Sequence, residues 1–314
     1  MAWWFWLIIG IVGAILLFFL FPTMLISNVI YTVLLVRKNQ EKWSRTVSWD
    51  NEEQRQMFAI GEEWGKKYDV YRKTVSITSC GFKLIGEYFD FGFDKAVIII
   101  PGRMESGTYS YYFSEPFRKA GYNVMAIDNR CHGLSEGRYN CLGMKEYKDI
   151  LNWIKFLHDE LGVKEVVIHG ICIGSATGLY AIIDKNCPHY VKGIIADGMY
   201  VNFNESFKNH LIEKKKPLFP FTWEVMMLIT LVSGHRPKKW GPLNKVKNLH
   251  KPILFIYSRE DQYSVPELSE VLYNACASED KQIAWFPHGE HSHVRINQTE
   301  GYDEAIINFL KEKC

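Results

Sequence analysis

The sequence predicts an α/β domain with a mostly parallel central sheet flanked by helices, an inserted cap and an N-terminal transmembrane helix. From Ala96 onward, aliphatic runs of strand length alternate with amphipathic helical segments, which is the pattern of a parallel sheet. Between Met199 and Leu249 a stretch rich in aromatic residues, proline and lysine interrupts this alternation, and we expect the cap there. The chain also carries no charged residue from Ala2 to Val36.

The N-terminal segment, residues 1–36, is predicted to be a single-pass membrane anchor. The stretch Trp3 to Phe21 is nearly all aliphatic or aromatic, and its length suits the hydrocarbon core of a bilayer. A buried core helix of this length would rarely lack a polar face, and a cleaved signal peptide would need a basic start and a small-residue cleavage site. Pro22 is expected to kink or end the first segment, because it lacks a backbone donor. Residues 23–36 then either continue the span or lie along the membrane surface.

The basic residues and the cysteines both favour a domain that faces the cytoplasm. No basic residue precedes the span, whereas four follow it directly, at positions 37, 38, 42 and 45. The seven cysteines show no paired spacing, which fits free thiols in a reducing compartment. Two glycosylation triplets, which begin at Asn204 and Asn297, point the other way, but they matter only in a secretory lumen.

The charge of the chain argues against a nucleic-acid partner. The net charge is +2 and no long basic block is present. The longest lysine run, Lys214–Lys216, is expected to form a solvated loop or to touch lipid headgroups. The oligomeric state does not follow from any of these features.

The elements of the body are expected in a regular order after a juxtamembrane linker and helix over residues 37–70. The main domain is predicted over residues 71–314, with the cap insertion at about 199–249. Two antiparallel strands come first, at Val75–Ser79 and Phe82–Phe91, joined by a turn. The later strands are expected at Ala96–Ile100, Asn123–Ile127, Glu165–His169, Lys192–Ala196, Ile253–Tyr257 and Gln282–Phe286. The helices between them are expected at Tyr109–Ala120, Met144–Leu161, from Ile173, at Pro266–Ala275 and at Tyr302–Lys311, with one in the linker at Asn51–Tyr68.

Within the cap, the segment Leu218–Val232 is apolar apart from Thr222, Glu224 and Thr230. A second membrane span is conceivable for such a segment. Its length and Glu224 instead favour a lid helix that covers an acyl-binding pocket.

The most informative run lies where a strand meets a helix, at residues 165–178. Gly170 and Gly174 stand two positions before and after Cys172, in the arrangement of a sharp turn that exposes a nucleophile. A cysteine at a helix N-terminus is favoured as thiolate by the backbone N–H groups and the helix dipole. Ser175 lies three residues into the helix, outside this frame. The alternative interpretation is a buried, inert cysteine.

This run resembles the nucleophile turn of the α/β-hydrolase fold, especially the subgroup of dienelactone hydrolases and prolyl-oligopeptidase-like esterases. The resemblance covers residues 55 to 313 in motif order, with Cys172 where most members carry serine. It implies that an acid follows the nucleophile and that a histidine comes last. The acid is predicted to be Asp261, which follows a buried strand and precedes a Val-Pro pair, with Glu260 as the alternative.

The same resemblance selects His291 among three clustered histidines, His288, His291 and His293, because family histidines follow a strand and a Gly-x pair. A metal site is the alternative for this cluster, but no further ligand pattern accompanies it. The oxyanion of the reaction is expected to be held by the backbone N–H of Ile173 and, by resemblance, that of Arg103.

Two neighbouring features complete this expectation. The Arg103 side chain is expected either to be solvated or to favour an anionic substrate. The segment Asp128 to Ser135 matches a family motif that is usually structural.

Together these features predict a hydrolase that cleaves an ester, a thioester or an activated amide through a Cys-His-Asp triad. An acyl-cysteine intermediate is expected, without a cofactor or metal. The anchor and the apolar cap favour a hydrophobic small molecule or an acyl lipid as substrate, and the membrane is the other expected partner. The alternatives are an acyltransferase with the same triad and a catalytically silent hydrolase-fold protein that binds a ligand or partner.

Overall fold

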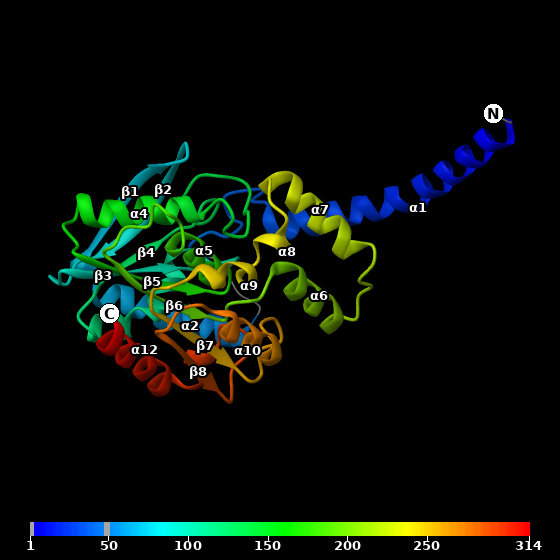
Figure 1. Cartoon of the computed structure of the whole chain (residues 1–314). Helices are drawn as coiled ribbons and strands as arrows, with labels where there is room; N and C mark the ends of the chain where they lie inside the picture. Colours follow the sequence, from blue (N-terminus) through cyan, green and yellow to red (C-terminus); the bar gives the residue numbers. More distant parts are fainter. Residues whose placement is uncertain (1–2, 47–50) are drawn as a thin grey trace.

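A computed structural model describes residues 3–46 and 51–314 of the chain, which form a mixed sheet covered by helices on both faces (Figure 1). Its strands lie in the order β1-β2-β4-β3-β5-β6-β7-β8. The pairs β1–β2 and β2–β4 are antiparallel and the remaining pairs are parallel, so the predicted mostly parallel sheet is confirmed. The strands are β1 Arg72–Ser79, β2 Phe82–Phe89, β3 Lys95–Ile100, β4 Asn123–Ile127, β5 Glu165–Ile171, β6 Val191–Asp197, β7 Ile253–Ser258 and β8 Lys281–Phe286.

Most helices alternate with the strands along the chain. The α-helices are α1 Trp3–Leu35, α2 Glu52–Lys67, α3 Glu115–Lys119, α4 Tyr147–Asp159, α5 Ile173–Ile182, α6 Phe203–Glu213, α7 Phe221–Ser233, α8 Pro237–Trp240, α9 Pro242–Lys245, α10 Pro266–Ala275, α11 Val294–Asn297 and α12 Thr299–Lys313. The 3-10 helices are η1 Asp69–Tyr71, η2 Gly107–Phe113 and η3 Val246–Asn248.

The central strands are apolar on both sides because helices cover both faces of the sheet. On β3, Ile98 and Ile100 belong to one buried cluster, whereas Val97 and Ile99 belong to the cluster on the opposite face. Burial on both sides explains why this strand appears in the sequence as a continuous aliphatic run rather than as an alternating one.

The helix predicted over residues 109–120 is wrong in one respect, because it is two shorter helices, η2 and α3. Pro116 lies at the start of α3 and has no N–H to donate to the carbonyl of Tyr112. That carbonyl instead accepts a 2.6 Å hydrogen bond from Nη1 of Arg295. The chain therefore turns at Ser114 rather than continuing as one helix.

Helix α1 continues through Pro22 to Leu35, so of the two outcomes expected at Pro22, a kink or an end of the helix, the end is wrong. Its last turns belong to the body, because Ser27, Tyr31 and Leu35 are buried. Within the described part of the chain, no helix combines the length and the apolarity that crossing a bilayer requires, and the predicted transmembrane helix is not found. Residues 1–2 of the predicted anchor and 47–50 of the predicted linker lie outside the described residues.

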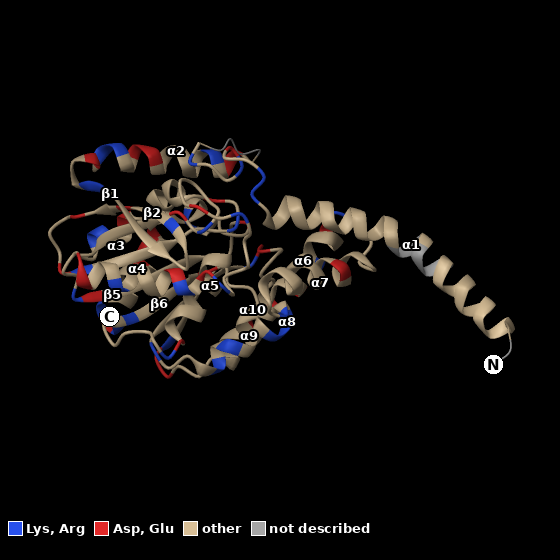
Figure 2. Cartoon of the chain, turned by 90° about the horizontal axis from the view of Figure 1, so that it is seen from above, with Lys and Arg blue, Asp and Glu red and all other residues tan. Residues whose placement is uncertain are grey.

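The segment between β6 and β7 holds helices α6 to α9, and among them α7 packs against α1 where α1 leaves the body (Figures 1 and 2). The expected lid helix is α7, which packs Val225 and Ile229 into the interior. The buried carboxylate of Glu224 accepts hydrogen bonds from the hydroxyls of Thr23, at 2.7 Å, and Ser27, at 2.6 Å. These contacts join α7 to α1 by side chains that are far apart in the sequence.

Candidate active site

Cys172 lies at a sharp turn between β5 and α5. Its backbone has a φ of 54° and a ψ of −112°, a conformation that residues with a side chain rarely adopt. A Cβ on Gly170 would lie 2.4 Å from the backbone of Gly174, and a Cβ on Gly174 would lie 2.0 Å from the carbonyl oxygen of Ile100. Glycine is therefore required at both positions. This close approach brings the N-terminus of α5 against the end of β3.

His291 and Asp261, the predicted histidine and acid, lie in contact with each other. The Nδ1 atom of His291 is 2.7 Å from Oδ2 of Asp261. The other carboxylate oxygen of Asp261 accepts hydrogen bonds from the N–H groups of Tyr263, at 2.8 Å, and Ser264, at 2.7 Å. Burial opposes ionisation of Asp261, but His291 and these donors outweigh it and hold the pKa of the carboxyl below its ordinary value.

The imidazole of His291 connects this carboxylate to Cys172. Burial opposes its charged form, but the Asp261 carboxylate and Cys172 outweigh burial and raise the pKa of His291 well above its ordinary value. Cys172 is close enough to His291 to interact with it, yet Nε2 has no well-aligned hydrogen-bond partner among the described residues. Such contacts are often loose without substrate. The arrangement favours an imidazolium beside the thiol.

The other candidates near this histidine contact different partners. The carboxylate of Glu260 lies 3.2 Å from Nδ1 of His288 and accepts a hydrogen bond from the N–H of Gly289, and the Glu260 and His288 side chains are exposed. Nδ1 of His293 is 2.9 Å from Glu53 on α2. The structure therefore brings Asp261, and not Glu260, to His291. In residues 3–46 and 51–314, no three metal-ligating side chains cluster.

The two expected oxyanion donors lie at the start of α5 and in the loop after β3. The N–H of Ile173 is the first of helix α5, where helical N–H groups have no partner within the helix. Arg103 lies in the loop that follows β3, next to the approach of α5. Within the described residues, neither backbone N–H donates to an acceptor.

The loop that contains Arg103 is held by side chains that the sequence did not single out. The carboxylate of Glu105 accepts a 2.8 Å hydrogen bond from the N–H of Gly102. Asn129 donates to the carbonyl of Pro101 at 3.1 Å, and Nε2 of His132 lies 2.6 Å from the carbonyl of Arg103. Asn129 and His132 belong to the motif at residues 128–135. The match of this segment to a family motif was the sequence signal for these two residues. In the structure, the motif positions the loop that contains Arg103.

The side chain of Arg103 is partly buried rather than solvated. Its Nη1 donates to the carbonyl of Leu34 at the end of α1, at 3.1 Å, and its guanidinium also interacts with Cys172. Burial lowers the pKa of Arg103. The end of α1 thus contacts the same loop as the expected oxyanion donor.

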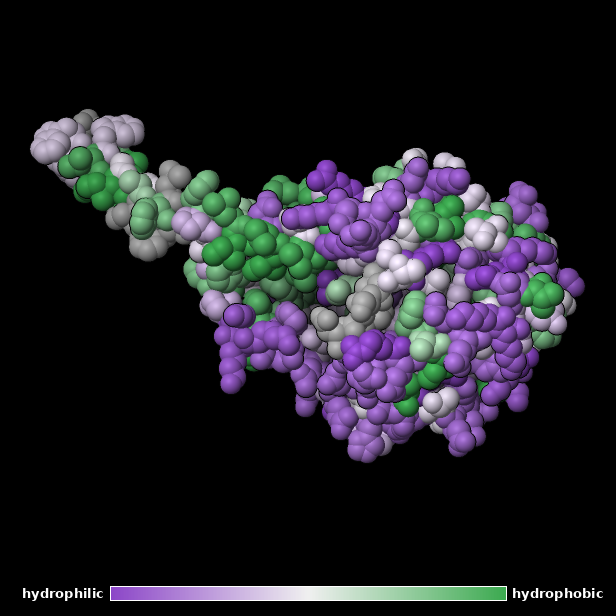
Figure 3. Space-filling view, turned by 180° about the vertical axis from the view of Figure 1, so that it is seen from behind, coloured by the Kyte–Doolittle hydropathy of each residue, from purple (hydrophilic) through white to green (hydrophobic). Residues whose placement is uncertain are grey.

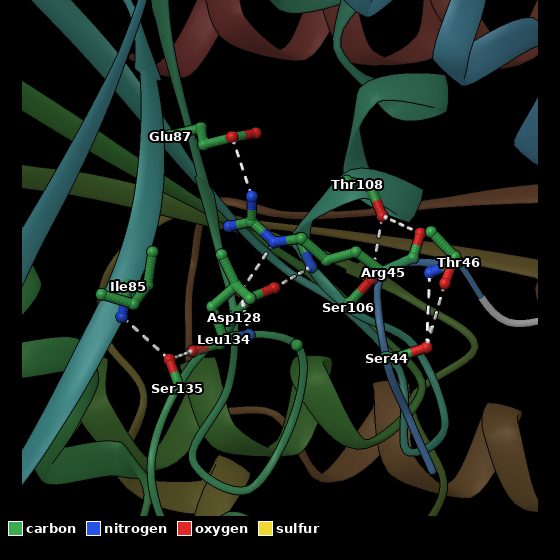
Figure 4. Close-up of polar contacts among 12 residues, drawn as sticks. Ser44, Arg45, Thr46, Ile85, Glu87, Ser106, Thr108, Asp128, Leu134 and Ser135 are labelled. Atoms are coloured by element: carbon green, nitrogen blue, oxygen red, sulfur yellow. Dashed lines mark hydrogen bonds and ion pairs between the residues drawn. The ribbon is translucent and has the colours of Figure 1, made fainter. Parts of the chain in front are cut away.

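The segment after α1 ties this region to the sheet (Figure 4). Arg45 donates to Asp128 at 2.9 Å and to Glu87 at 2.8 Å, and its own carbonyl accepts from the hydroxyl of Thr108. Trp43 stacks on the His132 ring, with ring centroids 4.5 Å apart. Trp43, which follows α1, therefore supports the imidazole ring of His132, and this ring contacts the carbonyl of Arg103.

Two buried carboxyl groups near His291 were not anticipated. Burial raises the pKa of Glu105 to about 7, although the N–H of Gly102 opposes this rise. Burial likewise raises the pKa of Asp197, at the end of β6, to about 7, although a hydrogen bond from Tyr302 opposes it. Each interacts electrostatically with His291. Burial depends on tertiary packing, so the local sequence gives no signal for either group.

Replacing Glu105 with glutamine should stabilise the protein above neutral pH. The pKa of Glu105 is raised in the folded state, so folding becomes less favourable as pH rises from about 4.5 through about 7. Glutamine keeps an acceptor for Gly102 and removes the buried charge. We expect Glu105→Gln to gain up to about 3 kcal/mol at pH 8 and little at pH 4.5. Unfolding measured at both pH values checks this, with Glu63→Gln on the exposed face of α2 as control. An equal gain at both pH values would contradict the explanation.

Comparisons with known proteins agree with this fold. A profile described as the alpha/beta hydrolase fold matches residues 95–228. The uncharacterized protein YqkD of Bacillus subtilis is 27% identical over 219 residues, 69% of this chain and 71% of that protein. The uncharacterized membrane protein YNL320W of Saccharomyces cerevisiae is 24% identical over 249 residues, 77% of this chain and 80% of that protein. The solved structure of the Pyrococcus furiosus esterase Pf2001 superposes with a TM-score of 0.66 at 25% identity, covering 79% of this chain and 94% of the esterase.

Proposed function

Because the chain has the α/β-hydrolase fold, we propose that it belongs to the α/β-hydrolase superfamily and hydrolyses an ester, a thioester or an activated amide with Cys172 as nucleophile. The observation that carries this proposal is the 2.7 Å contact between Asp261 and His291, beside a cysteine on a strained strand-to-helix turn. We also propose that the chain belongs to the subgroup of dienelactone hydrolases and prolyl-oligopeptidase-like esterases.

The proposed reaction is a double displacement. The thiolate of Cys172 attacks the carbonyl carbon, and the N–H groups of Ile173 and Arg103 stabilise the oxyanion. The imidazolium of His291 gives its proton to the leaving group, and the acyl group remains on Cys172. His291 then takes a proton from water, whose oxygen attacks the acyl carbon and releases the acid and the thiolate. Asp261 keeps the imidazole in the required tautomer and stabilises its charged form.

An apolar acyl group suits the surroundings of Cys172. A buried cluster joins Ile173 on α5 to the end of α1 and to the cap. The buried cap side chains in this cluster are Tyr200, Phe203, Phe207, Leu211, Val225 and Ile229. The proposed substrate is therefore hydrophobic, such as an acyl lipid. The apolar α1 supports a location at a membrane, and the basic residues that follow it support a body on the cytoplasmic side.

Selective alkylation tests the proposed nucleophile. Iodoacetamide should modify Cys172 faster than Cys80, although Cys80 is the more exposed thiol, because Cys172 has the His291 imidazole beside it as a base. Mass spectrometry of both peptides over time gives the two rates, and hydrolysis of a chromogenic ester should decline in step with Cys172 modification. If Cys172 reacts no faster than Cys80, the proposal is wrong. Product analysis with and without an added alcohol separates hydrolysis from acyl transfer, which the same three residues support.

A further inference from the structure

The turn between α6 and α7 exposes large apolar side chains. Leu218, Phe219 and Trp223 are 37%, 78% and 57% exposed, although each is large and apolar. We call residues 214–223, which contain these three side chains, the cap tip. Clustered apolar groups of this size on a protein surface are typical of a site that contacts a partner or a membrane.

The cap tip lies where α1 leaves the body. Glu224, next to Trp223, accepts hydrogen bonds from Thr23 and Ser27, so the start of α7 is fixed beside this part of α1. Towards the N-terminus, α1 projects from the body (Figure 1) and exposes further large apolar side chains. These include Trp3, Trp6, Ile8, Phe18 and Phe21.

Hydrophobic surface continues from the projecting helix onto the adjoining part of the body (Figure 3). No charged residue interrupts the sequence from Ala2 to Val36. A partner that covers this surface must therefore be apolar over both α1 and the cap tip. A lipid leaflet meets this requirement at two segments that are far apart in the sequence.

The lysines of the cap tip agree with a lipid leaflet as this partner. Lys214, Lys215 and Lys216 are exposed and precede the apolar residues of the turn. Lys214 lies 3.4 Å from Glu213, whereas Lys215 and Lys216 have no carboxylate partner among the described residues. Lysines beside exposed aromatic residues are typical of segments that lie in the headgroup region of a membrane with anionic lipids.

We propose that the cap tip inserts Leu218, Phe219 and Trp223 into the lipid leaflet that α1 enters, with its lysines on the phosphate headgroups. Entry of α1 into one leaflet is sufficient for this contact. The remainder of α7 packs Val225 and Ile229 into the cluster that contains Ile173, next to Cys172. Helix α7 thus connects the cap tip, which includes Trp223, to the apolar cluster beside Cys172. Combined with the proposed function, which this last step rests on, the substrate is an acyl lipid taken from that leaflet.

Photocrosslinking in the full-length chain tests the contact without any assay of activity. The protein is reconstituted into phosphatidylcholine and phosphatidylserine vesicles with p-benzoylphenylalanine in place of Phe219. The same substitution at Val70, which is 86% exposed on η1, is the control. We expect at least about ten times more lipid adduct at position 219 than at position 70, because only the first is held in the apolar region. Equal adducts at both positions, or adducts of position 219 with protein instead of lipid, would overturn the proposal.

A second experiment tests the link to substrate. The double variant Phe219→Ser/Trp223→Ser should lower kcat/KM about tenfold for an acyl lipid in vesicles, through a higher KM. Hydrolysis of a short water-soluble ester should stay within about twofold, as should both reactions of Val70→Ser. An equal loss on both substrates would show that the residues act on the site and not on lipid. If the wild type hydrolyses neither substrate, the proposed function is wrong. The crosslinking experiment still tests independently whether the cap tip contacts lipid.

Discussion

Replacing Cys172 with alanine should lower kcat/KM for ester hydrolysis by at least about 10³-fold, because no other group can form the acyl intermediate. The fold should be kept, since Cys172 is partly exposed and the strained turn is set by the packing of Gly170 and Gly174. Steady-state kinetics together with thermal unfolding of the purified variant check both statements. Cys172→Ser keeps a nucleophile in the same position and should retain more activity than the alanine variant.

Ser175→Ala is the matched control for this prediction. The Ser175 hydroxyl is fully buried and lies 2.5 Å from the carbonyl of Gly170 and 2.9 Å from that of Asp197. Its loss should cost about 1–2 kcal/mol of stability, as expected for a buried hydrogen bond, while kcat/KM changes only a few-fold. A fully active Cys172→Ala enzyme beside an inactive Ser175→Ala enzyme would reverse the assignment.

Asp261→Asn should reduce kcat/KM by roughly 10³- to 10⁴-fold, since asparagine neither holds the required imidazole tautomer nor stabilises its charged form. The pH dependence gives a second signature. The pKa of His291 is raised well above its ordinary value, chiefly by the Asp261 carboxylate, so the imidazolium persists at alkaline pH and is lost as pH rises through the raised pKa. Without that carboxylate, the alkaline limb of the kcat/KM profile should move to lower pH.

Glu260→Gln provides the control, one residue away in the same loop. The Glu260 carboxylate contacts His288 at the surface, and we expect its removal to change kcat/KM by less than about twofold. A profile in which Glu260→Gln shifts the alkaline limb and Asp261→Asn does not would assign the acid to Glu260.

The strand-to-helix turn at Cys172 was predictable because its determinants are local. Two glycines at fixed spacing around Cys172 are needed wherever a strand and a helix approach this closely, and the apolar runs on either side define both elements. Strand β4 was predicted with its observed bounds for a similar reason, since all five residues are buried.

The break between η2 and α3 was harder to predict, although Pro116 is visible in the sequence. The break leaves the carbonyl of Tyr112 without a helical donor, and that carbonyl is satisfied by Arg295, from a distant part of the sequence. A local pattern does not show such a partner. The helix predicted across residues 109–120 therefore looked uninterrupted.

The acid of the candidate site is a second case in which a local sequence pattern was not sufficient. Asp261 and Glu260 are neighbours, and spacing alone left both open. In the structure, Asp261 turns inward because its carboxylate accepts from the N–H groups of Tyr263 and Ser264, which closes the loop around it. The motif at residues 128–135 marked His132 in the sequence, but its contact with the Arg103 loop, like that from the end of α1, depends on tertiary packing that a local pattern does not show.

The burial of the last turns of α1 determines where the chain can be shortened for expression without detergent. A chain that begins at Arg37 would lack Tyr31 and Leu35, which cover Ile173 and the cap, and the Leu34 carbonyl to which Arg103 donates. A chain that begins near Thr23 would keep these groups, together with the hydroxyl of Ser27 for Glu224. For preparing this enzyme candidate in aqueous buffer, the useful boundary therefore lies inside the apolar segment rather than at its charged end.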